Sequence, residues 1–82
     1  MEHLVSNDPE ERILELLHRL NEMFAVDHER GRKILTHLTH EQIASMTGTS
    51  RVTVTRTLGR LRDKGVVSMD NGHMILARKI GK

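Results

Sequence analysis

The sequence contains no cysteine, tryptophan or tyrosine, and Phe24 is its one phenylalanine. The absence of cysteine excludes disulfides, thiolate zinc fingers and cysteine-ligated iron–sulfur clusters, so the fold depends on packing alone, which suits a reducing compartment. One aromatic side chain offers no platform on which unpaired bases could stack. This scarcity argues against a protein that binds single strands or RNA loops.

Long hydrophobic runs are also missing. No apolar stretch approaches the roughly 20 residues that span a bilayer, and the first residues are acidic, unlike the basic start of a signal peptide. We therefore expect a cytoplasmic protein. A chain of 82 residues is long enough for one compact domain and too short for a second core.

Charge is distributed unevenly along the chain. Residues 1–41 carry five basic and nine acidic side chains, a balance of −4, whereas residues 42–82 carry eight basic and two acidic ones, a balance of +6. The total net charge of +2 hides this asymmetry. The second half is therefore the part suited to contact a polyanion such as DNA.

The first helix is predicted to begin at Pro9 and to end at about Ala25. Asp8 can cap it, Pro9 suits the first helical position, and Glu11 completes a pattern typical of a capping box. Residues 26–33 then predict a turn, and residues 33–38 a short strand. One face of the helix repeats apolar residues at helical spacing and is expected to be buried: Ile13, Leu16, Leu17, Leu20, Met23 and Phe24.

A short helix is predicted next. Thr39 stands three residues before Gln42, as in a capping box, and Gly48 ends the helix. Its apolar face consists of Ile43, Ala44 and Met46.

A longer helix is predicted from Ser50, which can cap it, to Lys64, just before Gly65. Two apolar-rich runs, 66–70 and 73–77, are then separated by Asn71-Gly72, the dipeptide best suited to a type I′ hairpin turn. Together these elements predict a mainly α fold with a small β-hairpin. Three helices plus a wing make a winged helix-turn-helix.

The longer helix divides into a buried and an exposed face. Val54, Leu58 and Leu61 lie on one side and are expected to hold the helix against the core. Arginine can donate two hydrogen bonds to guanine and a valine or threonine methyl can contact thymine, so the opposite, slim and positive face suits a major groove. That face carries Arg51, Val52, Thr55, Arg56, Gly59 and Arg62.

Two segments resemble the C-terminal domain of the Crp/Fnr regulator family: LTHEQIA at residues 38–44 and GTSRVTVTR at residues 48–56. With the first helix and the hairpin, the resemblance extends over residues 8–78. A Ser-Arg-x-Thr-Val run also occurs in winged helices of the GntR type, but the LTHEQIA segment favours Crp/Fnr. The resemblance implies a bacterial transcription regulator whose residues 8–82 bind double-stranded DNA, with residues 1–7 as the remnant of a linker or dimerisation helix.

The resemblance also implies which residues contact DNA. Base contacts are expected from Arg51, Val52 and Arg56, to which the position of Thr55 on the exposed face adds a fourth. Arg60, on the flank of that face, is a further candidate for phosphate. The other phosphate contacts are expected from Thr39, His40, Ser50, Thr53, Asn71 and His73.

Two residues depart from the pattern of the family. The cyclic-AMP receptor branch has a glutamate where this chain has Val52, and the run from Arg51 to Arg56 looks more like the nitrogen-control branch. An acceptor for the cytosine amino group is therefore missing. Asp70 at the wing is also unfavourable, because a carboxylate repels phosphate.

The family further implies partners for the whole regulator. Its members bind palindromic operators as homodimers, contact RNA polymerase and sense an effector in a separate β-barrel domain. That domain does not fit ahead of Asp8, so we expect no cofactor in this chain, which resembles an excised or freestanding output domain. The effector class, whether nucleotide, 2-oxo acid, haem or iron–sulfur cluster, is not written in the sequence.

Two other functions were weighed against DNA binding. His37, His40 and Glu41 are the best material for an enzyme or a metal site, but no third ligand follows at metal spacing and no nucleophile stands with a base. No catalytic or metal-binding residues are therefore predicted. The alternative is a winged helix that binds a protein without DNA readout, and its complex would be insensitive to salt.

Overall fold

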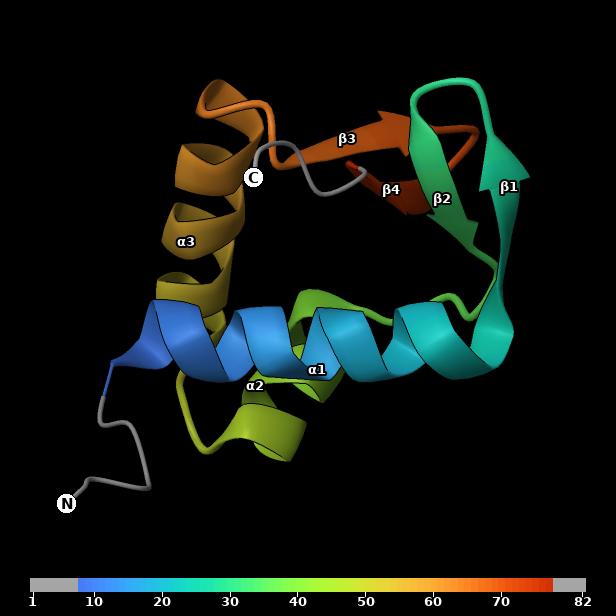
Figure 1. Ribbon diagram of the computed structural model, residues 1–82. Coiled ribbons are helices and arrows are strands. Elements are labelled where there is room, and N and C mark those ends of the chain that lie inside the picture. The colour runs from blue at the N-terminus through green and yellow to red at the C-terminus, as the bar shows by residue number, and fades with distance from the viewer. Residues whose placement is uncertain (1–7, 78–82) are drawn as a thin grey trace, which may run out of the picture.

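The computed structural model describes residues 8–77, which form three helices and a four-stranded antiparallel sheet (Figure 1). This arrangement confirms the winged helix-turn-helix fold. The predictions for residues 1–7 and 78–82 lie outside the described residues. In chain order the elements are α1 (Pro9–Phe24), β1 (Ala25–His28), β2 (Gly31–Ile34), α2 (His40–Thr47), α3 (Arg51–Asp63), β3 (Val67–Asp70) and β4 (His73–Leu76).

Helix α1 begins as predicted and buries less of its apolar face than expected. Asp8 is the N-cap and accepts a hydrogen bond from the Glu10 amide at 3.0 Å. The core covers this face only as far as Leu20. Met23 and Phe24 are exposed by 64% and 45%, so the prediction that they join the core is wrong. The buried residues of the helix are Ile13, Leu16, Leu17 and Leu20.

The segment between α1 and α2 differs most from the prediction. Residues 26–33 contain no simple turn, because β1 and β2 pair as an antiparallel hairpin. The strand predicted at 33–38 is also wrong in its bounds, since β2 begins at Gly31 and ends at Ile34. Strand β1 lies at the edge of the sheet and has no buried residue, so its residues show none of the apolar alternation from which a strand is predicted.

The two hairpins join into one sheet with the strand order β1-β2-β4-β3. Strand β2 pairs with β4, which places Lys33 opposite Ile75. Gly31 is buried at this junction, where a Cβ atom would collide with the carbonyl oxygen of Leu76. A glycine is therefore needed for β2 to approach the wing this closely.

The wing turn confirms the prediction from Asn71-Gly72. Strands β3 and β4 pair from Val67 opposite Leu76 to Asp70 opposite His73. Between them, Asn71 and Gly72 have φ angles of 52° and 84°. Two positive φ angles in a two-residue loop are the signature of the type I′ turn.

Helices α2 and α3 are both capped as predicted. In α2, Thr39 Oγ1 accepts from the Gln42 amide at 3.0 Å, and Gln42 Oε1 accepts from the Thr39 amide at 2.8 Å, which completes a capping box. Gly48 ends α2 in the left-handed conformation. In α3, Ser50 Oγ accepts from the Thr53 amide at 3.1 Å. Hydrogen bonds within three residues of one another therefore set both helix starts of the motif.

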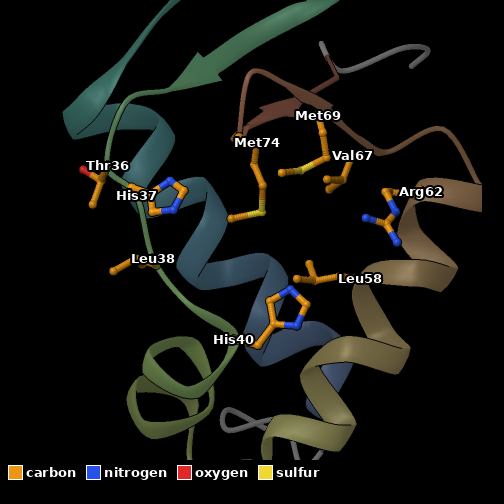
Figure 2. Close-up of a pocket in the computed structure, with 10 residues that line it drawn as sticks. Thr36, His37, Leu38, His40, Leu58, Arg62, Val67, Met69 and Met74 are labelled. Atoms are coloured by element: carbon orange, nitrogen blue, oxygen red, sulfur yellow. The ribbon is translucent and has the colours of Figure 1, made fainter.

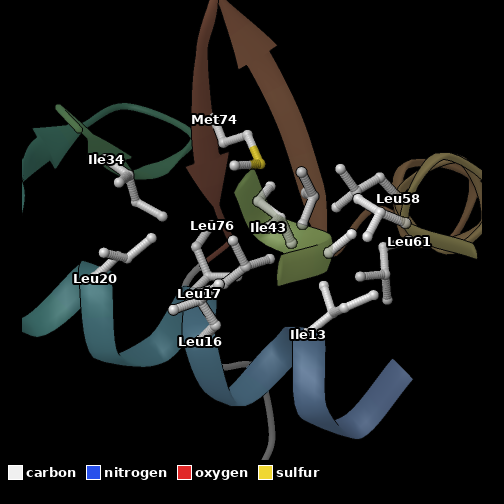
Figure 3. Packing of buried hydrophobic residues seen from close by; sticks show 13 residues of the cluster. Ile13, Leu16, Leu17, Leu20, Ile34, Ile43, Leu58, Leu61, Met74 and Leu76 are labelled. Atoms are coloured by element: carbon white, nitrogen blue, oxygen red, sulfur yellow. The ribbon is translucent and has the colours of Figure 1, made fainter. Parts of the chain in front are cut away.

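The core lies where the three helices meet the inner face of the sheet (Figure 3). Met46, which was predicted on the apolar face of α2, does not join the core, because this side chain is exposed by 55%. Thr47 is buried instead, and its hydroxyl donates to the Ile43 carbonyl at 2.8 Å, so this buried hydroxyl is satisfied. The predicted anchors of α3 are all buried: Val54, Leu58 and Leu61.

Candidate nucleic-acid interface

The exposed face of α3 is the centre of the candidate interface. Burial of Val54, Leu58 and Leu61 fixes the rotation of the helix, so the residues on the opposite side point away from the core. Val52 is exposed by 56%, a large apolar surface for a side chain that stands among arginines. The four residues predicted to read bases are all exposed here: Arg51, Val52, Thr55 and Arg56.

The arginines of α3 differ in their surroundings. Among residues 8–77, Arg51, Arg56 and Arg62 have no carboxylate within ion-pair distance. Arg60, predicted to contact phosphate, lies against α1, where its Nε is 3.3 Å from Glu10 Oε1. Lys64 Nζ lies 3.5 Å from the other oxygen of the same carboxylate. Glu10 thus ties the end of α3 to α1 and leaves the positive charge of the other arginines unopposed.

The hydroxyls at the start of α3 have a defined donor order. Ser50 Oγ accepts from the Thr53 amide and donates to Thr53 Oγ1 at 2.9 Å. A hydroxyl carries one proton, so Ser50 has none left to donate to phosphate. The free proton of this pair belongs to Thr53, so the Thr53 hydroxyl and the first backbone amides are the donors that this end of α3 can offer to an anion. The phosphate contacts of Ser50 and Thr53 stay predictions.

The start of α2 lies beside the same face of α3. Thr39 Oγ1 accepts from the Gln42 amide and retains its own proton, which it can donate to a phosphate. His40 follows as the first helical residue, and its Nδ1 lies 2.7 Å from Thr55 Oγ1. The structure therefore connects His40, predicted to contact phosphate, to Thr55, predicted to read bases.

The wing tip presents Asn71 and His73, both predicted to contact phosphate. Asn71 is exposed at the turn. His73 is half-buried, and its ring lies edge-on to His37 with 5.9 Å between the ring centres. Its Nδ1 is buried and makes no hydrogen bond in the part of the chain that the structure describes. A phosphate contact from His73 is therefore left to Nε2.

Asp70, whose negative charge is unfavourable at a wing, is surrounded by cationic groups. Lys33 Nζ on β2 lies 3.2 Å from Asp70 Oδ2, and His28 Nε2 lies 3.4 Å from the same oxygen. The hydrogen bond from Lys33 is the largest influence and lowers the pKa of Asp70 below its usual value. Burial opposes this shift, and the charges of Lys33, His28 and Arg30 add to it. The carboxylate is thus neutralised locally.

Sequence reasoning missed Arg30 and Lys33 as neighbours of the wing. Arg30 donates from Nη2 to the Met69 carbonyl at 3.3 Å, and Lys33 pairs with Asp70 as described above. Both contacts depend on the pairing of β2 with β4. No local sequence pattern predicts that pairing, since Arg30 and Met69 stand 39 residues apart and Lys33 and Asp70 stand 37 apart.

A small cavity of about 60 Å³ opens between α3, the wing and the segment that precedes α2 (Figure 2). Leu58, Val67 and Met74 form its apolar wall, whereas His40 and Arg62 bring polar groups to its edge. Gly72 of the wing turn also lines it. The cavity therefore marks the place where α3, the segment before α2 and the wing come together.

Two other kinds of site were searched for over residues 8–77. Three or more histidine, cysteine or acidic side chains do not gather there in an arrangement that could hold a metal ion, so His37, His40 and Glu41 form no such cluster. Over the same residues, each helix is too short or too polar to cross a membrane.

Comparison with known proteins supports the interpretation of the chain as a helix-turn-helix domain. A family model of the Crp-like helix-turn-helix domain matches residues 11–80. The global nitrogen regulator of Nostoc sp. strain PCC 7120 is 39% identical over 69 residues, which cover 84% of this chain and 31% of that protein. The anaerobic regulatory protein of Bacillus subtilis strain 168 is 36% identical over 61 residues, which cover 74% of this chain and 26% of that protein. The chain thus spans about a third or less of these relatives.

Solved structures show the same fold. The CO-dependent transcription factor CooA from Carboxydothermus hydrogenoformans superposes with a TM-score of 0.76 at 27% identity, over 84% of this chain and 32% of that one. Reduced CprK without ligand superposes with a TM-score of 0.78 at 23% identity, over 92% of this chain and 36% of that one.

Proposed function

The chain belongs to the Crp-like helix-turn-helix domain family, and on that premise we propose that it binds a specific site on double-stranded DNA with α3 in the major groove. One observation carries the proposal. The face of α3 that holds Arg51, Val52, Thr55 and Arg56 is exposed, while the opposite face is buried in the core. Nothing between residues 8 and 77 covers or neutralises the two arginines on it.

Base reading follows from the chemistry of this face. Arg51 and Arg56 can each donate two hydrogen bonds to O6 and N7 of a guanine. The exposed Val52 side chain offers apolar contact to a thymine methyl, and it offers nothing to a cytosine amino group. The operator is therefore expected to contain guanines, with a thymine near one of them.

Phosphate contacts position the helix in the groove. Thr39 and Thr53 retain hydroxyl protons at the starts of α2 and α3, where the first backbone amides of a helix also attract anions. Asn71 is exposed at the wing turn, next to Gly72, which lines the cavity. These groups are candidates to hold the DNA backbone on both sides of the groove.

The whole regulator has a wider role than this domain. We propose that the domain is the output unit of a bacterial Crp/Fnr-type transcription regulator, which acts in the cytoplasm without catalysing a reaction. Two copies bind a palindromic operator, and RNA polymerase is a further partner. The effector is sensed outside the residues of this domain, so no cofactor is assigned to it.

The proposal is tested by selecting bound duplexes from a pool with a random segment, using the 82-residue chain at low salt. We expect recovered duplexes to share a short guanine-containing sequence, and the affinity to fall steeply with added salt. A variant with Arg51→Ala and Arg56→Ala is the matched control and should recover no shared sequence. Recovery of random duplexes by the unchanged chain, or a salt-insensitive complex with a protein, would refute sequence-specific DNA binding.

A further inference from the structure

One hydrogen bond of the interface joins a residue predicted to contact phosphate to a residue predicted to read bases. His40 Nδ1 lies 2.7 Å from Thr55 Oγ1, a short distance for a bond between side chains of different helices. His40 is the first residue of α2, and Thr55 lies one turn into α3 on its exposed face. Figure 2 shows the ring of His40 between the start of α2 and α3. The Thr55 hydroxyl that would face the bases is therefore already hydrogen-bonded to His40.

The protons of this pair are coupled. In a neutral imidazole one nitrogen donates and the other accepts. Because Nδ1 faces Thr55, Nε2 is the nitrogen left for a DNA phosphate, whose oxygens only accept. A neutral ring that donates from Nε2 accepts at Nδ1, so the Thr55 hydroxyl donates to it. Thr55 then presents lone pairs and a methyl group to the groove, and no proton.

We propose that His40 determines sequence specificity indirectly, by bonding a phosphate through Nε2 and holding Thr55 through Nδ1 as a hydrogen-bond acceptor toward the bases. His40 is thus a positioning residue for base reading, an inference that rests on the proposed function. Adenine and cytosine carry amino donors in the major groove, whereas guanine shows acceptors alone. Thr55 is therefore expected to favour adenine or cytosine, or the thymine methyl, and to disfavour guanine on the strand that it faces.

Two substitutions at His40 separate the roles of the two ring nitrogens. In asparagine the amide oxygen and nitrogen are bonded to Cγ, as Nδ1 is in histidine. His40→Asn therefore keeps a hydrogen-bond partner for Thr55, but its side chain is too short to bond the phosphate that Nε2 would contact. The amide of glutamine lies one bond further out, near Nε2, so His40→Gln keeps a donor for phosphate and loses the partner for Thr55. The matched variant Thr55→Val keeps the shape of Thr55 and removes its hydroxyl.

The experiment measures affinities of the 82-residue chain for its selected duplex, with each base pair changed in turn. Thr55→Val should change the preference at one base pair by about two- to tenfold, the effect of one hydrogen bond, and so mark the base that Thr55 reads. His40→Gln should reduce the preference at that base pair by a similar factor, and it should lower affinity for random duplex less than His40→Asn does. In a Thr55→Val background it should have no further effect on this preference.

His40→Asn should show the opposite pattern, with the base preference kept and affinity for all duplexes lowered. Each preference is a ratio of affinities of one variant for two duplexes, so partial unfolding of a variant cancels. The inference is overturned if Thr55→Val changes no base preference, if His40→Gln keeps the full preference, or if the Gln and Asn variants behave alike. A wild-type chain that selects no site would overturn the proposed function itself.

Discussion

At α3, what each side chain can offer to DNA depends on the hydrogen bonds that it already makes. Arg51 and Arg56 are exposed and have no acidic partner over residues 8–77, so their guanidinium groups are free to bind guanine. Arg60, four residues after Arg56, is paired with Glu10 at 3.3 Å. Sequence position alone treats these arginines as equivalent, whereas their neighbours in space distinguish them.

Replacement of either free arginine should remove base discrimination. We expect Arg51→Ala or Arg56→Ala to cost about 1–3 kcal/mol on the selected site and to flatten the preference at one base pair, because a paired contact to guanine is lost. Filter binding or fluorescence anisotropy on matched and mismatched duplexes measures both effects. Arg19→Ala removes the same charge from the exposed surface of α1 and is the control. Equal losses on selected and random duplexes would contradict a base-reading role.

Among the elements, the sheet contains two single residues on which the approach of its strands depends. Gly31 lets β2 lie against the backbone of β4, and Asp70 ties β3 to β2 through Lys33. The wing is therefore held by the β1–β2 hairpin as well as by its own turn. Two predictions test this attachment.

The first concerns a pair of glycines. Gly31→Ala should destabilise the domain by about 1–3 kcal/mol, because the added Cβ collides with the Leu76 carbonyl and the strands must separate. Gly59→Ala, within α3, meets no atom within 4 Å and should stabilise the domain by about 0.5–1 kcal/mol through its higher helix propensity. Urea unfolding followed by circular dichroism gives both values. Similar effects of the two substitutions would show that β2 does not need a glycine at this junction.

The second prediction concerns the loss of stability at low pH. The pKa of Asp70 is lowered in the folded chain by the hydrogen bond from Lys33, so the folded state binds this proton more weakly than the unfolded state. Its stabilising contribution is therefore present above the unfolded pKa of about 3.9 and is lost as the pH falls through the lower folded value. Urea midpoints at pH 2–6 should fall with acid less steeply in Asp70→Asn than in the wild type.

The control for this experiment is Asp63→Asn, which removes an equal charge from the exposed end of α3. Its urea midpoints should follow the wild-type pH dependence, apart from a constant offset. If Asp70→Asn instead has the same pH dependence as the wild type, the wing is not held by this carboxylate.

For the whole molecule, a single copy offers one α3 to DNA, so the palindromic operator proposed above would need a second copy to read its other half. Two copies joined through a dimeric coiled coil should prefer duplexes whose half-site centres are about 10 base pairs apart, which is one DNA turn. Their affinity should be far lower for duplexes whose half-site centres are about 15 base pairs apart. Off-register spacing places the second half-site on the opposite side of the DNA. The unlinked chain should not distinguish the two spacings, and an equal affinity of the joined copies for both would argue against two-fold binding.

Local rules acting within a few residues were enough to predict much of this structure. Thr39 and Ser50 cap helices whose amides lie three residues away, and Asn71-Gly72 adopts the backbone angles that its side chains favour. Apolar spacing along α3 identified Val54 as buried, because helical geometry converts sequence separation directly into a direction in space. The three helices, the wing and the exposed face of α3 therefore follow from the amino-acid sequence.

Only the tertiary structure decided how distant residues modify that face. The partners His40 and Thr55 stand 15 residues apart, and Arg60 and Glu10 stand 50 apart. Strand β1 and the exposure of Phe24 were likewise unpredictable, since an edge strand has no apolar alternation and burial depends on what covers a side chain. Residues far apart in sequence meet only when the whole core forms, so no local pattern can encode which charges are paired and which hydroxyl protons remain free.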